Sequence, residues 1–314
     1  MSSISGLPGR LWGFAPLLLA LAVLSWAANS VVGRAMAGTV PPMALSFWRW
    51  VFAFLAVTPL AWPHLKGDWR ELVRGWPMVV VLGASGVAGM GAFVYLGVQS
   101  TTALNSILLQ AAMPPIVLLF GRLLLRDRTS AGQALGVGLS LLGVVVIICQ
   151  GRPWNLLDLR LNPGDALILT GVLLYSGYSL LLRFRPKVHP LSWLWATFAV
   201  AVLVIAPFYA AELVDGRSFA LGFKAAWGIG FVALFPSVLA YLFYNRGVEL
   251  IGVGRASQFM HLMPVFGAVM AVALLGESFH LFHAAGLALI AAGIATATVS
   301  ARAQARAALA AARA

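Results

Sequence analysis

The chain has 314 residues, of which 61% are hydrophobic and only 10% are charged, and its mean hydropathy is +0.93. Soluble domains carry about 25% charged residues, so a chain this apolar cannot cover itself with polar surface in water. The formal net charge of +12 would suit nucleic acid, but the basic residues lie between apolar runs and form no single groove. One cysteine, Cys149, excludes an internal disulfide.

Ten apolar runs follow one another along the chain, and each is about as long as the roughly 20 residues that cross a bilayer as a helix. They are 12–35, 43–62, 76–98, 103–124, 132–150, 164–183, 191–211, 225–245, 255–275 and 280–300. The first run could be a signal peptide cleaved after Ala35-Met36-Ala37, but its apolar core exceeds the roughly 7–15 residues of such a signal. We predict an all-α integral membrane protein with ten transmembrane helices.

The loops between the runs predict the orientation. If the N-terminus lies in the cytoplasm, most of the 21 Lys and Arg residues fall on cytoplasmic loops, for example Lys66, Arg70 and Arg74 after the second run. The opposite side then carries Arg34, Arg152, Arg160, Arg217 and Lys224. Positive charge gathers on the cytoplasmic side of membrane proteins, so we predict cytoplasmic N- and C-termini in the inner (plasma) membrane.

The second half of the chain repeats the first at an offset of 150 positions. Met113-Pro114 falls on Met263-Pro264 and Asp127 falls on Glu277. Further along, Ala134, Gly136, Leu139 and Gly143 fall on Ala284, Gly286, Leu289 and Gly293. Earlier positions align at slightly smaller offsets: Ser30 and Arg34 with Ser179 and Arg183 at 149, and Pro42 with Pro190 at 148.

The repeat predicts a domain organisation. We expect a first five-helix repeat over 11–150, a second over 151–300 and a cytoplasmic tail over 301–314. Because five is odd, the second repeat enters the membrane in the opposite direction. Inverted repeats are the architecture of many secondary transporters, whose substrate site lies at the repeat interface.

Two stretches carry a family resemblance. LLLRDRTSAGQALGVGLSLLGVVVII (123–148) and LLGESFHLFHAAGLALIAAGIA (274–295) resemble the twin signature of the EamA family in the drug/metabolite transporter superfamily. That signature is a proline in the fourth span of each half, an acidic residue after an apolar run, and a Gly-rich fifth span. The stretch from Trp26 to Ser30 is similar to the family's first-span signature, whereas Arg126-Asp127 departs from the usual Gly-Glu that Gly276-Glu277 keeps.

The resemblance implies a fold and a function. The fifth and tenth spans would lie outside a central cavity formed by the first four spans of each half. Within the family, the chain is most similar to the YddG-type exporters of aromatic and other neutral amino acids. Export of amino acids out of the cytoplasm is therefore what the resemblance implies.

Prolines and glycines interrupt several of the apolar runs. Pro114, Pro115, Pro236 and Pro264 each remove a helical hydrogen bond and loosen the helix. Pro236 falls opposite Gly86, so both repeats weaken the same helix near its middle. For the glycines, close helix packing and a gating hinge remain equal alternatives, while for Pro114 and Pro264 we favour the hinge. Asp127 and Glu277 are expected to cap the helix that follows each of them.

Several chemistries are disfavoured by what the spans lack. None of the nine acidic residues lies at the centre of a span, which argues against proton coupling and favours a facilitator. The sequence has no GxxxxGK[ST] loop for a nucleotide and no HExxH metal motif, so we predict no enzyme, cofactor or metal. The alternatives are a proton-coupled drug or metabolite exporter, a channel, and a sugar-phosphate or nucleotide-sugar carrier. The last of these would need several buried basic residues.

Polar and aromatic side chains within the spans predict the site. We expect substrate contacts from Trp26, Asn29, Ser30, Tyr95, Gln99, Gln110, Tyr175, Tyr178, Tyr241, Asn245, Gln258 and His261. An α-helix would put Gln258 and His261 on one face, either in a cavity or in an interhelical hydrogen bond. Arg49 could hold a substrate carboxylate, but we favour a structural role, such as reaching the interface.

Aromatic rings with uncharged hydrogen-bonding groups suit a neutral or zwitterionic organic solute. We therefore predict a secondary transporter of small neutral or zwitterionic metabolites, amino acids including aromatic ones, working by alternating access. Its partners would be this solute and the lipid bilayer, with no nucleic acid, and a monomer is the simplest assembly.

Overall fold

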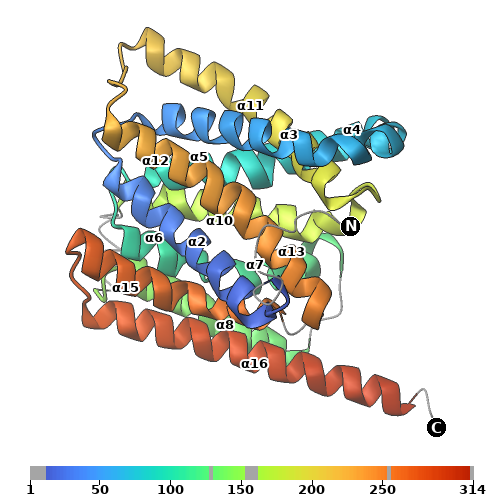
Figure 1. The fold of residues 1–314 in the computed structure, drawn as a ribbon. Coiled ribbons are helices and arrows are strands. Elements are labelled where there is room, and N and C mark those ends of the chain that lie inside the picture. Colours follow the sequence, from blue (N-terminus) through green and yellow to red (C-terminus); the bar gives the residue numbers. More distant parts are fainter. Residues whose placement is uncertain (1–11, 127–129, 153–161, 253–255, 312–314) are drawn as a thin grey trace.

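The computed structural model describes residues 12–126, 130–152, 162–252 and 256–311, and this part of the chain consists of helices and the segments that connect them, with no strand (Figure 1). The first repeat contains α2 (Ala15–Ala35), α3 (Pro42–Arg74), α4 (Trp76–Leu82), η1 (Gly83–Gly89), α5 (Met90–Gly97), α6 (Ala103–Gln110), α7 (Met113–Leu124) and α8 (Ala131–Ile148). The second contains α10 (Pro163–Leu181), η2 (Leu182–Phe184), α11 (Pro190–Val214), α12 (Phe223–Leu234), η3 (Phe235–Leu239), α13 (Ala240–Ile251), η4 (Ser257–Leu262), α15 (Met263–Leu275) and α16 (Leu281–Ala311).

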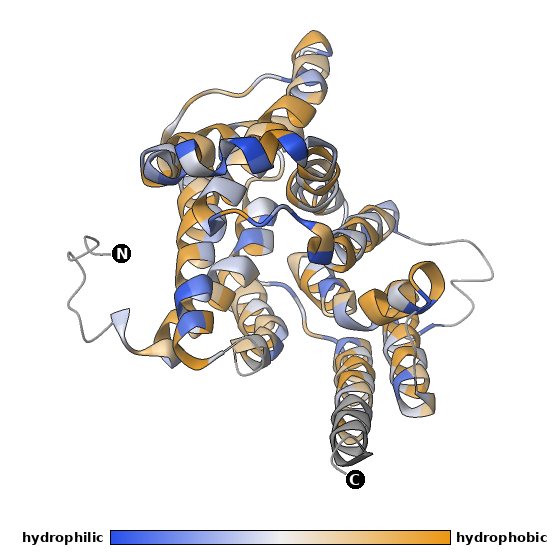
Figure 2. Ribbon diagram, turned by 90° about the vertical axis from the view of Figure 1, so that its right-hand side faces the viewer, coloured by the Kyte–Doolittle hydropathy of each residue, from blue (hydrophilic) through white to orange (hydrophobic). Residues whose placement is uncertain are grey.

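Most of these helices are long and apolar enough to cross a membrane. Eight candidate spans lie within the described residues, and the bent pair α6–α7 makes a ninth if it is counted as one span. The segment Phe259–Leu275 is apolar but shorter. Figure 2 shows hydrophobic residues over most helical turns. The prediction of an all-helical membrane protein is confirmed, while ten crossings and the orientation of the termini stay predictions.

Helix α3 is longer than the second apolar run, which ends at residue 62. The helix continues to Arg74 through a charged segment with Lys66, Asp68 and Glu71. A hydropathy criterion ends the span where charges begin, but charged residues support a helix well at its polar end. Proline at positions 59 and 63 does not end it either.

The two repeats contain a π-helix at equivalent places. Residues Gly83–Gly89 form η1 and residues Phe235–Leu239 form η3, so Gly86 and Pro236 lie in the same part of each copy. A π-helical turn leaves the regular hydrogen-bond ladder and often marks a functional site. At Gly86 an added Cβ would collide with the ring of Tyr178, so this glycine also permits close packing.

The repeated prolines mark breaks in equivalent helices. Helix α6 ends at Gln110, and α7 begins at Met113 with an axis bent by 41°. In the second copy, the 3₁₀-helix η4 changes to the α-helix α15 at Met263, just before Pro264. The prolines thus stand at the first turn of a new helix, where the missing N–H costs nothing.

Two pairs of corresponding helices, α8 with α16 and α3 with α11, pack against each other antiparallel. Helix α8 lies along α16 at the lower edge of Figure 1. An added Cβ at Gly143 would lie 2.6 Å from the Gly286 carbonyl oxygen, and Gly136 approaches Gly293 equally closely. Glycines let the two backbones touch, which explains why the repeat has them in both copies.

Helices α3 and α11 are joined at both ends by carboxylates that cap the partner helix. Glu212, near the end of α11, accepts from the backbone N–H groups of Met43 (3.1 Å) and Ala44 (2.9 Å). Asp68, near the end of α3, accepts from the N–H of His189 (3.0 Å). Each carboxylate satisfies donors that a helix N-terminus leaves free, and the arrangement has the symmetry expected of an inverted repeat.

Glu277 caps a different helix from the one we expected. Its carboxylate accepts from the N–H groups of Ala103 and Leu104, both at 2.8 Å. The capped helix is therefore α6, not the tenth span α16 that follows Glu277 in sequence. Two free N–H groups of a helix from the other repeat hold the carboxylate, which sequence order alone cannot indicate. The partner position, Asp127, lies outside the described residues.

Candidate substrate cavity

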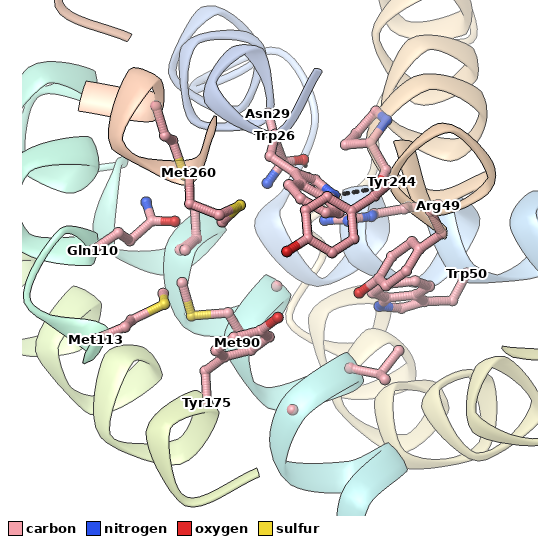
Figure 3. Close-up of a pocket in the computed structure, with 17 residues that line it drawn as sticks. Trp26, Asn29, Arg49, Trp50, Met90, Gln110, Met113, Tyr175, Tyr244 and Met260 are labelled. Carbon is pink, nitrogen blue, oxygen red and sulfur yellow. Dashed lines mark hydrogen bonds between the residues drawn. The ribbon is translucent and has the colours of Figure 1, made fainter. Parts of the chain in front are cut away.

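A cavity of about 220 Å³ lies between the two repeats (Figure 3). Its walls come from α2, α3, η1, α5, α6 and α7 of the first repeat and from α10, η3, α13, η4 and α15 of the second. The lining residues are Trp26, Asn29, Arg49, Trp50, Gly86, Val87, Met90, Gly91, Val94, Gln110, Met113, Tyr175, Pro236, Tyr241, Tyr244, Met260 and Met263. Neither α8 nor α16 contributes a described residue to this wall.

A second cavity of about 210 Å³ lies next to the first. The two share part of their walls, including Trp26, Tyr175 and Tyr241. From there the second cavity reaches Arg185 and Pro190, at the connection between α10 and α11. The two cavities therefore lie side by side between the repeat interface and the end of the molecule where α11 begins.

The π-helix η3 positions two residues of the opposite repeat at the cavity. Trp26 donates its indole N–H to the Pro236 carbonyl oxygen (3.0 Å), and Arg49 donates from Nε to Ser237 Oγ (2.7 Å). Ser237 Oγ in turn donates to the Val232 carbonyl oxygen, five residues earlier (2.7 Å). The irregular turn thus fixes the orientation of both side chains.

Arg49 is buried, with 6% of its surface exposed, although it lies in a wall of the cavity. Its Nη1 donates to Asn29 Oδ1 (3.2 Å) and to Tyr95 Oη (3.0 Å), and Tyr95 Oη donates to Asn29 Oδ1 (2.7 Å). The guanidinium carbon lies 4.3 Å from the centre of the Trp50 ring, a cation–π contact. Arg49 is thus held by four neutral groups.

Aromatic rings form the side of the cavity next to α2. Trp26 lies 5.6 Å from Tyr241 and 5.3 Å from Tyr244 between ring centres. Tyr175 and Tyr178 lie 5.2 Å apart on α10. At the offset of 149, Tyr175 occupies in the second repeat the position that Trp26 has in the first. The equivalent helices α2 and α10 therefore each place a large aromatic ring in the walls of both cavities.

Seven of the predicted site residues line one or both cavities. Trp26, Tyr175 and Tyr241 line both, Asn29 and Gln110 line the first, and Tyr178 and Asn245 line the second. They come together because residues three or four positions apart share a helix face, as Trp26 and Asn29 do on α2. Which of them contact a substrate stays a prediction.

Three predicted residues lie behind or beside the cavity wall. Ser30 is buried and accepts from Gln110 Nε2 (3.0 Å). Tyr95 is fully buried and holds Arg49 and Asn29. Gln99 is exposed at the end of its helix, where its side chain donates to the Tyr95 carbonyl oxygen (3.2 Å). In this structure Ser30 and Tyr95 support residues that do line the cavity.

The ninth apolar run presents different residues from those we expected. The side chain of Gln258 lies outside the described part of the chain, and His261 is exposed and lines neither cavity. Met260 and Met263 face the cavity instead. We took the polar residues as the inner face of this run, but Val265, four positions after His261, is exposed as well, so it is the face with the methionines that turns inward.

Several lining residues carried no clear signal in the sequence. Four are methionines, which fill apolar gaps in most helical proteins and indicate nothing by themselves. Tyr244 could have been found, because it lies three positions after Tyr241 on the same helix face. Arg49 was considered but assigned to structure, since its depth from the membrane edge did not reveal a cavity beside it.

Three carboxylates lie outside the cavity wall and are bonded to neighbouring groups: those of Asp165 and Glu212, which are buried, and that of Glu277, which is half-buried. Asp165, fully buried, accepts from the Thr101 hydroxyl and from Asn105 Nδ2 (3.3 Å to each oxygen). Asn105 Oδ1 is also joined to His283 Nε2 (3.0 Å). Asp165, Glu212 and Glu277 therefore satisfy donors at helix ends, and among the described residues none of them pairs with Arg49.

A family model described as the EamA-like transporter family matches the chain twice, over residues 13–149 and 162–299. The chain belongs to the EamA-like transporter family. It is therefore a multi-pass membrane transporter built from two EamA domains, and not an enzyme. A solved crystal structure supports this fold: it covers 92% of the chain and 97% of its own, with a TM-score of 0.61 and 19% identity.

Curated relatives of this EamA chain match over most of their length. An uncharacterized transporter of Bacillus subtilis, YyaM, is 29% identical over 83% of the chain and 86% of its own. An uncharacterized transporter of Archaeoglobus fulgidus is 28% identical over 88% and 95%. A probable terminal-alkyne amino-acid exporter of Streptantibioticus cattleyicolor is 24% identical over 82% and 84%.

Proposed function

We propose that this EamA transporter moves small neutral or zwitterionic metabolites, amino acids including aromatic ones, out of the cytoplasm. The observation that carries the proposal is the cavity between the repeats, which combines aromatic rings, amide groups and a single guanidinium. Its volume of about 220 Å³ is below the roughly 300–1,000 Å³ of sites for drug-sized ligands. A small metabolite is therefore a better fit than a large drug.

The polarity of the wall supports a zwitterionic solute over a sugar phosphate. A phosphate carries nearly two negative charges, and proteins hold it with several Arg or Lys side chains. Among the described residues, Arg49 is the basic side chain in the wall of the first cavity. The aromatic rings and the relative that carries the name of an amino-acid exporter favour amino acids, and the YddG-type exporters remain the subfamily that we propose.

Alternating access is the mechanism that we propose. The second cavity reaches Arg185 and Pro190, which lie on a predicted cytoplasmic loop. At the opposite end, Glu277 caps α6, Glu212 caps α3, and Arg34 donates to the Val98 carbonyl oxygen (2.7 Å). In the proposed orientation, this is a state open to the cytoplasm. Bending at the breaks before Pro114 and Pro264 would then open the other side.

A facilitator fits the distribution of carboxylates. Proton-coupled carriers use membrane-embedded acidic groups that exchange protons with the transport path. Here the first cavity has no acidic residue in its described wall. Asp165 is buried but bonded to Thr101 and Asn105, away from the path. We therefore propose transport down the gradient of the solute itself.

The test is uptake into proteoliposomes with a panel of labelled amino acids, with and without an imposed pH gradient. We expect saturable uptake of aromatic and other neutral amino acids that the pH gradient leaves unchanged. Absence of uptake for every amino acid would refute the proposed substrates. Strong acceleration by the proton gradient would refute the facilitator and favour the proton-coupled alternative.

A further inference from the structure

Arg49 is a buried positive charge that lacks a counter-ion among the described residues. Its partners are Ser237, Asn29, Tyr95 and the Trp50 ring, all of them neutral groups. A guanidinium keeps its charge in proteins, so Arg49 cannot become neutral as a buried lysine can. Burying such a charge without an anion is costly, and this cost is lowered when an anion enters the cavity.

One end of the guanidinium remains available for that anion. Nε and Nη1 are taken by side chains, whereas Nη2 has no hydrogen bond within the described structure. Nη2 is also not fully enclosed by protein atoms. Because Arg49 lines the cavity, the free donor is the part of the group that an entering solute can reach.

Gly91 keeps the space beside Arg49 open. An ideal Cβ at Gly91 would lie 3.5 Å from Arg49 Nη1 and 3.8 Å from Trp50 Nε1. The Trp50 Nε1 is itself buried and has no hydrogen-bond partner in the described residues. Of these two groups, Arg49 Nη1 already donates to Asn29 and Tyr95. Trp50 Nε1 and Arg49 Nη2 are therefore the donors without a partner among the described residues, and a carboxylate can accept from them.

The second repeat does not supply a matching charge. Helices α3 and α11 begin at Pro42 and Pro190, which confirms the offset of 148 for this pair. At that offset the counterpart of Arg49 is Thr197, whose hydroxyl donates to carbonyl oxygens of its own helix. The two repeats therefore differ at this pair of positions, and the positive charge of Arg49 lies on one side of the cavity alone. This asymmetry would fix the direction in which a solute lies.

The opposite side of the cavity is mainly apolar, and the Gln110 amide lies among its methionines. Met90, Met113 and Met260 face Arg49 and Trp50 across the space in Figure 3, and Met263 completes this wall. Methionine side chains are flexible and polarisable, and they adapt to apolar groups of different shape. The wall thus suits the side chain of a solute whose charged end lies at Arg49.

We infer that Arg49 binds the carboxylate of the transported solute and that the methionine wall receives its apolar part. This inference rests on the proposed transport function, because it assigns the two ends of the solute within the same cavity. It goes further in one respect: the carboxylate, rather than the amino group, is what the cavity requires. Organic acids without an amino group would then be accepted too.

A series of solutes that share a phenylethyl group tests the requirement on the wild-type protein. Phenylalanine has both charged groups, 3-phenylpropanoate only the carboxylate, and phenylethylamine only the amino group. We expect phenylalanine and 3-phenylpropanoate to compete for transport and to raise the Tm of the purified protein. Phenylethylamine should bind on the order of tenfold or more weakly, as the loss of a charge-assisted hydrogen bond predicts. Equal binding of the amine, or no binding of either carboxylate, would overturn the inference.

Variants assign the effect to Arg49. Arg49→Gln should abolish the preference for the carboxylate over the amine, and Arg49→Lys should retain part of it. The matched control is Arg34→Gln, which removes the same charge from an arginine bonded to the Val98 carbonyl oxygen outside the cavity wall. It should lower stability without changing the preference. A folded Arg49→Gln protein with unchanged preference would show that Arg49 only clamps the helices.

The outcomes separate this inference from the proposed function. Exchange of 3-phenylpropanoate without exchange of any amino acid would refute the amino-acid proposal and support the carboxylate site. Exchange of amino acids together with equal acceptance of phenylethylamine would support the amino-acid proposal and refute the carboxylate site. If Arg49→Gln does not fold, the comparison of the three solutes on the wild-type protein and on Arg49→Lys still tests whether Arg49 binds the carboxylate.

Discussion

Replacement of Gly143 by alanine tests the antiparallel contact between α8 and α16. The added Cβ would lie 2.6 Å from the Gly286 carbonyl oxygen, 2.9 Å from Ile290 Cγ1 and 3.0 Å from Ile290 N. Ordinary van der Waals contacts of Cβ atoms begin near 3.4 Å, so the helices must separate by most of an ångström. Two of the three obstacles are backbone atoms, which cannot rotate away.

The expected loss of stability follows from two opposing effects. Overpacking of this kind costs about 1–3 kcal/mol, and a rigid backbone obstacle puts Gly143→Ala in the upper part of that range. Alanine recovers up to about 1 kcal/mol because it favours a helix more than glycine does. We expect a net destabilisation of about 1–2 kcal/mol, and a lower Tm in detergent by thermal unfolding.

Gly138→Ala is the matched control in the same helix. An added Cβ at Gly138 meets nothing within 4 Å, so only the helix-propensity gain remains and the Tm should stay equal or rise. The difference between the two variants should amount to at least about 4 °C. Equal Tm values for Gly143→Ala and Gly138→Ala would refute the close contact between the two helices.

Three further predictions concern single side chains. Glu277→Ala removes the acceptor of two N–H groups of α6 and should cost about 1–2 kcal/mol; an unchanged Tm would contradict this cap. Burial and the stacked ring of His64 lower the pKa of His189, so the folded protein binds fewer protons there than the unfolded chain, and stability should fall as the pH drops below about 6.5. His189→Asn keeps a side chain that can cap the helix but removes the titrating group, so its Tm should fall less than that of the wild type as the pH is lowered. Identical curves of Tm against pH for the two proteins would contradict this role of His189. Tyr244→Ala should raise the KM for phenylalanine more than for alanine, because an aromatic contact is lost; equal changes in uptake would contradict a role in the site.

The sequence predicted the parts of the fold that depend on composition and repetition. Apolar runs of fixed length give the helices, because a bilayer leaves no other way to satisfy the backbone. The offset of 150 predicted which glycines correspond, and the structure shows Gly143 against Gly286, one from each copy. It also predicted that both copies weaken the helix at Gly86 and Pro236, where the two π-helices lie.

The remainder depends on contacts between distant residues. Glu277 caps α6, 174 positions away from Ala103, and no local rule selects that helix. His261 lines neither cavity because its face of the ninth run, which also carries Val265, is exposed, while methionines form the inner face. Arg49 was assigned to structure because a single sequence shows its depth but not its neighbours. Its setting emerges only where η3 of the other repeat brings Ser237 to it.

The most direct test of the proposed transport is counterflow in proteoliposomes that contain the wild-type protein. Vesicles are loaded with unlabelled phenylalanine and the entry of labelled phenylalanine is followed. A carrier that alternates around the cavity predicts faster and transiently accumulating entry when phenylalanine is present inside than when the vesicles are empty. Identical entry into loaded and empty vesicles would contradict alternating access to this site.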